Sequence, residues 1–467
     1  MMAHAVTVPA ASLSALRQLD QLPLSRFHWK LLFVGGLGWM FDAMDVLIVG
    51  SVVAAVAREW GLDATTSQWV NTANLAGLFL GALASGLLSD RLGRKVVFTL
   101  TLLVYSIFNG LSAAATGVGM LIALRFIAGL GLGGELPVAA TLIAEFMPAA
   151  RRGSMVVLLE SFWAYGSVLA ALIGFLVIPT WGWRAAFIIG AIPAFYAFVI
   201  RRTLPESPRF LVSQGRYQEA DVVVRSLSAA SAGGVPAAGS ARAPGAADGA
   251  PRATGAGELF APGVRSRTLV LWVMWATMNF SYYGIFLWLP TQFVRKGFSL
   301  QDALLFNLII AVAQIPGYFS AAYLVERLGR KGTLVLYLFG AAIGAYFFGQ
   351  EALVAKDVAA ILVWGSVVSF FNLGAWGVVY TYTPEMYPTA LRGTGSGWAA
   401  AFGRIFAFIA PLSVAFLVGA LGRDELVFLV FTLVMVAGGL VVLAAGPETR
   451  GQSLDDAMPL VASPARG

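Results

Sequence analysis

The sequence predicts an all-α membrane protein whose twelve transmembrane helices form two pseudo-symmetric six-helix bundles. Of its 467 residues, 58% are hydrophobic and only 12% are charged, which is about half the charged share of an ordinary soluble domain. Apolar stretches of about 20 residues recur along the chain, and a helix of that length crosses the hydrocarbon core of a bilayer. Related loop motifs occur in both halves of the chain, which indicates duplicated halves.

Twelve apolar segments account for the predicted helices, six in each half. They are 28–57, 67–88, 96–116, 119–144, 155–179, 184–202, 267–291, 303–325, 333–350, 357–382, 394–419 and 425–446. The first bundle is therefore predicted over 28–202 and the second over 267–446. The tails 1–27 and 447–467 remain outside the bundles.

A linker over 203–266 joins the two bundles. Its central part, 228–258, consists mostly of Ala, Gly, Pro and Ser, a composition that cannot bury an apolar core. We expect this part to be a flexible connection. The preceding stretch 206–226 has helical periodicity with charges on one face, so we expect it to lie along the membrane or to dock on the bundle.

The distribution of basic residues predicts the orientation in the membrane. With the N-terminus in the cytoplasm, all but eight of the 31 Lys and Arg residues fall in cytoplasmic loops and tails, as the positive-inside rule requires. We therefore expect both termini in the cytoplasm. Two of the eight exceptions, Arg125 and Arg404, lie within helices. The other six lie on the opposite side of the membrane: Arg58, Arg184, Arg295, Lys296, Lys356 and Arg423.

The composition argues against several other classes of protein. The net charge of +7 is spread in short basic clusters between apolar segments, so nucleic-acid binding is not expected. The chain has no cysteine, and its two histidines, His4 and His28, both lie near the N-terminus. A metal site, a catalytic triad or a bound cofactor is therefore not expected, and neither is an enzyme.

Three loop motifs recur in the second half at nearly the same offset. The segment 90–95 (DRLGRK) recurs as 326–331 (ERLGRK), 236 residues later. Two related halves that face each other across a site near the membrane midplane are typical of alternating-access transporters. In the other two motifs, Glu145 and Arg152 match Glu385 and Arg392, and Glu206 matches Glu448.

These motifs resemble those of the major facilitator superfamily. The segment 86–95 (GLLSDRLGRK) resembles the signature between the second and third helices of that superfamily. The segments 205–209 (PESPR), 384–388 (PEMYP) and 447–451 (PETRG) are similar to its sugar-porter branch. The resemblance covers nearly the whole chain and implies the major facilitator fold and a monomeric multi-pass transporter in a bacterial inner membrane.

The charged loop residues are expected to bridge neighbouring helix ends on the cytoplasmic side. We predict that they latch the outward-open state and separate in the inward-open state. The alternative is that each of them only anchors its helix. The predicted gating residues are Asp90, Arg94, Glu145, Arg152, Glu206, Glu326, Arg330, Glu385, Arg392 and Glu448.

Asp42 and Asp45 lie on one face of the first helix, near the membrane midplane. An ionised carboxylate is costly there, so the pair is a candidate for proton coupling. Its Asp-x-x-Asp pattern resembles the first helix of bacterial aromatic-acid/proton symporters and of nicotinate transporters related to synaptic-vesicle and organic-ion carriers. Arg125 resembles the arginine that faces this position in proton-coupled sugar porters. The alternative is a structural pair neutralised by neighbouring helices.

Arg404 in the eleventh helix is the main candidate for substrate binding, and it resembles an arginine of organic-anion carriers. A guanidinium stays charged and can hold a carboxylate through two parallel hydrogen bonds, although an internal ion pair is the alternative. Aromatic and polar side chains at helical spacing would complete a pocket for a flat ring. The other predicted substrate-binding residues are Trp39, Asn71, Asn74, Glu160, Trp275, Asn279, Tyr282, Tyr283, Asn372 and Trp376.

The pocket residues favour an importer of a small aromatic carboxylate, and the resemblance implies that this substrate is nicotinate. The expected partners are the substrate, protons and the lipid bilayer. A sugar or polyol transporter is an alternative, but no Gln-Gln pair precedes Asn279. An organic-cation carrier and a receptor without transport activity are further alternatives. The glycine-rich segment 129–134 (GLGLGG) is expected to allow close helix packing and not to bind a nucleotide.

Overall fold

The computed structural model describes residues 23–92, 94–147, 152–193, 195–196, 205–213, 216–231, 256–387 and 391–450. The regular structure of these residues is entirely helical. Most of the low-complexity stretch 228–258 and of both tails lies outside the described residues.

The described part of the first bundle contains five long helices. They are α2 (Arg26–Trp60), α3 (Ala64–Leu92), α4 (Arg94–Ser112), α5 (Val118–Phe146) and α6 (Arg152–Ile189). Gly182 interrupts α6 with a φ of 78°, a conformation that favours glycine. The fifth predicted segment therefore lies before this break and the sixth begins after it.

The second bundle has the same plan but more interruptions. Its elements are α10 (Arg265–Phe286), α11 (Leu289–Arg295), α12 (Leu300–Val312), α13 (Gln314–Phe347), η3 (Phe348–Ala352), α14 (Leu353–Ala355), α15 (Val358–Glu385), α16 (Arg392–Leu421) and α17 (Asp424–Ala445). The seventh predicted segment is thus divided between α10 and α11. Gly329, with a φ of 81°, separates the eighth segment from the ninth.

The described helices correspond to eleven of the twelve predicted spans and to the beginning of the sixth. Among the described residues, eight helical stretches are long and apolar enough to cross a membrane. One of these, Leu300–Ala355, contains two predicted spans, and Leu158–Ile189 contains the fifth span and the first residues of the sixth, 184–202. The second and fourth spans correspond to α3 and α5. The prediction of an all-α membrane protein with twelve helices is therefore confirmed.

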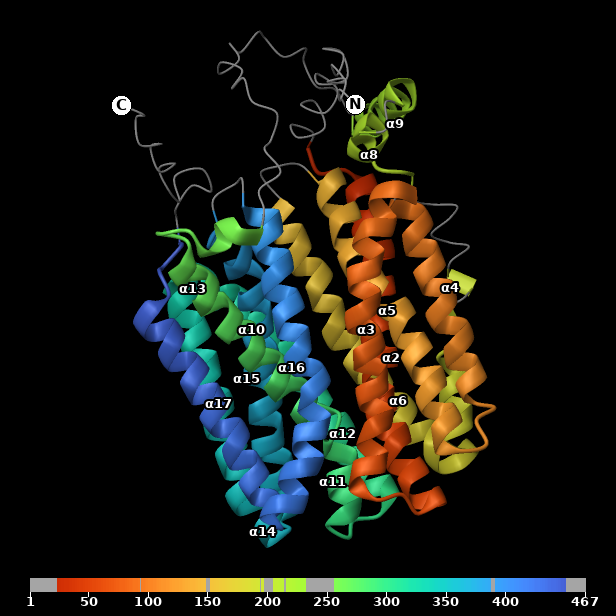
Figure 1. The fold of residues 1–467 in the computed structure, drawn as a ribbon, viewed down its shortest axis with the longest axis vertical. Coiled ribbons are helices and arrows are strands. Elements are labelled where there is room, and N and C mark those ends of the chain that lie inside the picture. Colours follow the sequence, from red (N-terminus) through yellow and green to blue (C-terminus); the bar gives the residue numbers. More distant parts are fainter. Residues whose placement is uncertain are drawn as a thin grey trace.

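The two bundles stand side by side, with α2 to α6 in one and α10, α13, α15, α16 and α17 in the other (Figure 1). The linker contributes α8 (Pro208–Ser213), α9 (Tyr217–Ser231) and the short η2 (Ala256–Phe260). Figure 1 shows α8 and α9 at one end of the first bundle. We call this end, where the repeated loop motifs also lie, the motif end.

Glycines allow α3 and α5 to pack closely. A Cβ atom on Gly129 would collide with the carbonyl group of Asn74, and one on Gly133 would collide with that of Leu78. Small residues at such contacts let helix backbones approach each other within a membrane. The predicted packing role of the glycine-rich segment is confirmed.

The two halves contact each other away from the motif end. Ser167 Oγ on α6 lies 2.5 Å from Gln314 Oε1 on α13, within hydrogen-bond distance. Near the far end of α2, a Cβ atom on Gly50 would lie 2.9 Å from the carbonyl oxygen of Leu287. These contacts join the halves from the middle of α6 to the end opposite the loop motifs.

Candidate functional site

A cavity of about 440 Å³ lies between the two bundles. Its walls come from α2, α3 and α6 of the first half and from α10, α13, α15 and α16 of the second. Glu160, Thr383 and Ser396 line it near the motif ends of α6, α15 and α16. Because the halves meet beyond it at the opposite end, the cavity extends toward the motif end.

Nine of the residues that line the cavity are aromatic. The rings of Trp275 and Trp376 meet edge to face with centroids 5.5 Å apart, and Tyr380 lies 5.3 Å from Trp275. Trp163 Nε1 of the first half donates a hydrogen bond of 2.7 Å to the Tyr282 hydroxyl of the second. The wall can therefore hold a flat ring. The aromatic lining residues are Trp39, Phe79, Trp163, Trp275, Tyr282, Tyr283, Tyr318, Trp376 and Tyr380.

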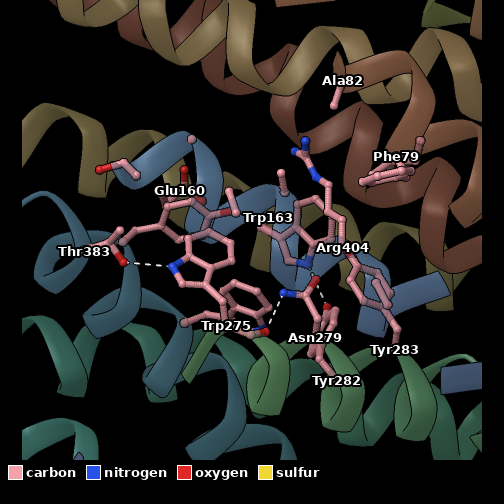
Figure 2. Close-up of a pocket in the computed structure, with 18 of the residues that line it drawn as sticks. Phe79, Ala82, Glu160, Trp163, Trp275, Asn279, Tyr282, Tyr283, Thr383 and Arg404 are labelled. Atoms are coloured by element: carbon pink, nitrogen blue, oxygen red, sulfur yellow. Dashed lines mark hydrogen bonds between the residues drawn. The ribbon is translucent and has the colours of Figure 1, made fainter. Parts of the chain in front are cut away.

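Arg404 brings a positive charge into this aromatic cavity from α16 (Figure 2). Among the described residues it forms no ion pair, although the other membrane-buried arginine, Arg125, does. The internal pairing that the sequence left open for Arg404 is therefore not seen in the part of the chain that the structure describes. A guanidinium with its donors available can hold an anion inside the cavity.

Most of the predicted substrate residues line the cavity, but three asparagines do not. Asn372 instead donates a hydrogen bond of 3.2 Å to Ser281 Oγ, and Asn71 donates one of 3.0 Å to Gln68 Oε1. Asn74 is buried where α3 packs against Gly129 of α5. The predicted residues in the lining are Trp39, Glu160, Trp275, Asn279, Tyr282, Tyr283, Trp376 and Arg404.

Several lining residues are not among the predicted ones. Trp163 lies one helical turn after Glu160, and Tyr380 lies one turn after Trp376. Helical spacing from the predicted residues could have identified both. Thr383, two turns after Trp376, shares this spacing, whereas Tyr318 carries no such signal. Thr383 Oγ1 accepts a hydrogen bond of 2.9 Å from Trp275 Nε1 (Figure 2).

The predicted proton-coupling residues form a second buried cluster. Asp45 and Arg125 are both fully buried, and Arg125 NH1 lies 3.5 Å from Asp45 Oδ1. Asn109 also donates a hydrogen bond to this carboxylate oxygen. Arg125 Nε donates to Ser112 Oγ at 3.2 Å, and its guanidinium lies 4.7 Å from the ring centroid of Phe187. The pairing of the first-helix aspartate with the fourth-helix arginine is thus present.

Helix α2 connects this cluster to the cavity. Asp42 is 1% exposed and lies one turn before Asp45. Trp39, one turn before Asp42, lines the cavity. The two acidic residues therefore lie beside the cavity and outside its lining.

The repeated Pro-Glu motifs perform the same structural task in each half. Glu206 accepts hydrogen bonds of 3.3 Å from the backbone N–H of Lys95. In the second half, Glu448 accepts bonds of 2.9 and 3.1 Å from the backbone N–H groups of Arg330 and Lys331. Each carboxylate thus satisfies N–H groups at the start of a helix, where negative charge is also favoured. A Cβ atom at Gly329 would clash with the Glu448 carboxyl group, which explains the glycine of this motif.

An arginine fork completes the network of the second half. Arg330 Nε and NH2 donate to the Glu385 carboxylate at 3.0 and 3.1 Å, and Thr449 Oγ1 donates to it at 2.6 Å. Arg330 NH1 also lies 3.5 Å from Glu326 Oε1. These bonds join α13, just after its break at Gly329, and the end of α15 to the segment after α17, all within one half. The side chains of Asp90, Arg94, Glu145, Arg152 and Arg392 lie outside the described residues.

Glu448→Ala should lower the melting temperature of the purified protein. Burial alone would raise the pKa of Glu448, but hydrogen bonds from the backbone N–H groups of Arg450, Arg330, Lys331 and Thr449 outweigh it and hold the pKa below its ordinary value of 4.5. Their loss should cost about 2 kcal/mol. Because the pKa is lowered on folding, this stabilisation is complete above pH 4.5 and decreases as the pH falls through the lowered value.

Thermal melting in detergent at several pH values measures this effect. Glu326→Ala is the matched control, because its side chain is 69% exposed and also contacts Arg330. Its removal should change stability by less than about 0.5 kcal/mol. Equal effects of the two substitutions at neutral pH would contradict the role given to Glu448.

The chain is similar over most of its length to proteins named as transporters. It is 45% identical over 438 residues to the niacin transporter NiaP of Acinetobacter baylyi, covering 94% of this chain and 98% of that protein. It is 43% identical over 435 residues to a NiaP protein of Bacillus subtilis, whose name mentions both niacin and nicotinamide, with coverage of 93% and 99%.

The fold is also that of a known transporter. The xylose transporter XylE of E. coli, in a partially occluded inward-open conformation, superposes with a TM-score of 0.73 at 18% identity, covering 92% of this chain and 100% of that one. The model of the family described as sugar (and other) transporter matches residues 26–460. The chain therefore belongs to the sugar (and other) transporter family of the major facilitator superfamily, and it is a multi-pass membrane transporter and not an enzyme.

Proposed function

We propose that this transporter imports nicotinate together with a proton across a bacterial inner membrane by alternating access. The observation that carries the proposal is Arg404, a cation in an aromatic cavity with no carboxylate partner among the described residues. A buried charge without a partner is costly, so a bound anion would complete the site. Niacin is the substrate named for the relative from Acinetobacter baylyi.

Nicotinate suits both parts of this cavity. Its carboxylate can accept two parallel hydrogen bonds from Arg404, and its flat ring can pack against the surrounding aromatic side chains. The cavity of about 440 Å³ has the size of an ordinary small-molecule site. Neither a sugar nor an organic cation accounts for an arginine in this position, because the former lacks a negative charge and the latter would be repelled.

Proton coupling follows from the charge of the substrate. An inside-negative potential opposes the entry of a monovalent anion by about 2.3 kcal/mol per 100 mV. Carriage of one proton with each anion makes the step electroneutral. We assign the proton to the pair Asp42 and Asp45, because two nearby carboxyl groups do not titrate independently, and we assign to Arg125 the control of its release.

Alternating access assigns a direction to the observed cavity. If the positive-inside rule holds, the motif end faces the cytoplasm, and the structure represents an inward-facing conformation. In the outward-facing conformation, the loop residues Asp90 and Arg94 and their counterparts Glu326 and Arg330 would hold the cytoplasmic ends of the two halves together. The described bonds of Arg330 stay within the second half, so the bonds between the halves would form only on closure.

Nicotinamide is the second candidate, because it occurs in the name of the relative from Bacillus subtilis. It has the same ring and nearly the same shape as nicotinate but lacks the negative charge. Binding at Arg404 therefore predicts a preference for nicotinate, whereas recognition by the aromatic wall alone predicts similar binding of both compounds.

The proposal is tested by thermal shift and calorimetry on the purified protein. We expect nicotinate to bind at least tenfold more tightly than nicotinamide, since hydrogen bonds to charged groups contribute about 1.5–3 kcal/mol. At 100 times its Kd, nicotinate should stabilise the protein by about 2.7 kcal/mol. Equal affinities, or binding of neither compound, would contradict the proposal.

A further inference from the structure

The cavity contains an acidic side chain to which the proton-coupling scheme gives no role. Glu160 on α6 lines the cavity and is only 4% exposed. Trp163, one turn further along the same helix, lines the cavity as well, so this face of α6 points inward. Among the described residues, no ion pair or hydrogen bond satisfies the Glu160 carboxyl group.

Glu160 and Arg404 line the same cavity without neutralising each other. Figure 2 shows them reaching in from α6 and α16, with aromatic side chains around them. Tyr283 and Tyr380 lie close to both Glu160 and Arg404. The site therefore offers a cation and an acid as separate groups, with aromatic rings near each.

The surroundings of Glu160 determine which hydrogen bond it can offer. An ionised carboxylate that is buried and has no ion-pair partner is strongly disfavoured, so the uncharged acid is the favoured form of Glu160. An uncharged carboxylic acid has one O–H donor. The ring nitrogen of nicotinate carries a lone pair and no hydrogen near neutral pH, so it is an acceptor that such a donor can serve.

We propose that the protonated Glu160 donates a hydrogen bond to the ring nitrogen of nicotinate while Arg404 holds the carboxylate. This inference rests on the proposed function and adds a selectivity element to it. The proton stays on Glu160, so the bond requires no net proton transfer. A site that offers a hydrogen bond to a substrate discriminates against an analogue that lacks the corresponding group, because the buried donor is then left without a partner.

Benzoate is the analogue that isolates this contact. It has the same carboxylate on a six-membered aromatic ring, but a C–H group replaces the ring nitrogen. We expect the wild-type protein to bind nicotinate about tenfold more tightly than benzoate, which corresponds to one hydrogen bond of about 1.4 kcal/mol.

Two substitutions separate the hydrogen bond from the charge and volume of the side chain. Glu160→Gln keeps a donor and should retain most of the preference for nicotinate. Glu160→Leu removes the donor and should lower nicotinate affinity about tenfold. The ratio of the Kd for benzoate to the Kd for nicotinate should then approach one. Ser161→Ala is the control, because the Ser161 hydroxyl donates to the Leu158 carbonyl oxygen and does not line the cavity. The ratio of the benzoate and nicotinate Kd values for Ser161→Ala should equal the wild-type ratio.

The experiment is calorimetric titration of each detergent-purified variant with nicotinate and with benzoate. A full preference for nicotinate in Glu160→Leu would overturn the role of Glu160. Equal binding of nicotinate and benzoate by the wild-type protein would also overturn this role, independently of any variant. That result would leave the proposed function intact. If the wild-type protein binds neither acid, the proposed function fails together with the role of Glu160. Failure of the Glu160 role alone is thus distinguished from failure of the proposed function.

Discussion

Arg404→Ala should weaken nicotinate binding more than any other single change in the cavity. The guanidinium lies among aromatic side chains and has no carboxylate partner in the described part of the chain. Removal of one member of a buried charge pair costs about 3 kcal/mol, so the Kd should rise by more than a hundredfold. Calorimetric titration of the purified variant with nicotinate measures this change.

Two comparisons separate the effect on binding from an effect on folding. Arg404→Lys keeps the charge but loses the paired hydrogen bonds, so it should also bind more weakly, by about tenfold. Arg423→Ala removes a 64% exposed arginine that pairs with Glu425, and it should bind like the wild type. Unchanged nicotinate affinity in Arg404→Ala would exclude Arg404 as the carboxylate site.

Asp45→Asn should abolish accumulation of nicotinate driven by a pH gradient. Asp45 is fully buried and is held by Arg125 and Asn109. Asparagine accepts no proton, so the variant should complete only those steps in which no proton is released. Exchange of internal for external nicotinate should therefore persist, while net accumulation falls to background.

Proteoliposomes that contain labelled nicotinate separate these two activities. Exchange serves as the internal control for folding, because an unfolded variant would fail in both assays. Asp42→Asn, one turn earlier on the same helix, tests the other member of the pair. If both variants accumulate nicotinate with normal pH dependence, the assignment of the proton to this pair is wrong.

The parts of the fold that depend on local chemistry could be predicted from the sequence. The loop motifs contain the glycine that a φ of 81° requires at Gly329 and the carboxylate of Glu448 that caps the next helix. The bond from the backbone N–H of Lys95 to Glu206 is the counterpart of these bonds in the first half, where the motif recurs. The pair of Asp45 and Arg125 was expected from the resemblance to proton-coupled sugar porters, and it gives each of these membrane-buried charges a partner.

It was harder to predict which side chains of a helix point into the cavity. Asn71, Asn74 and Asn372 appear as favourable for substrate binding as Asn279, yet they pack between helices. In a helix that is apolar on all sides, periodicity does not identify the face that lines a cavity. The division of the seventh span into α10 and α11 was also not predicted, because its apolar pattern continues across the break.

Uptake of labelled nicotinate by wild-type proteoliposomes tests proton-coupled transport most directly. The proposed electroneutral symport predicts that an imposed pH gradient, with the lumen alkaline and no membrane potential, drives accumulation above equilibrium. An imposed inside-negative membrane potential without a pH gradient should neither drive nor oppose the uptake of nicotinate. If the nicotinate concentration in the lumen never exceeds the external concentration under the pH gradient, proton symport is contradicted. A lack of any protein-dependent uptake would contradict nicotinate transport itself.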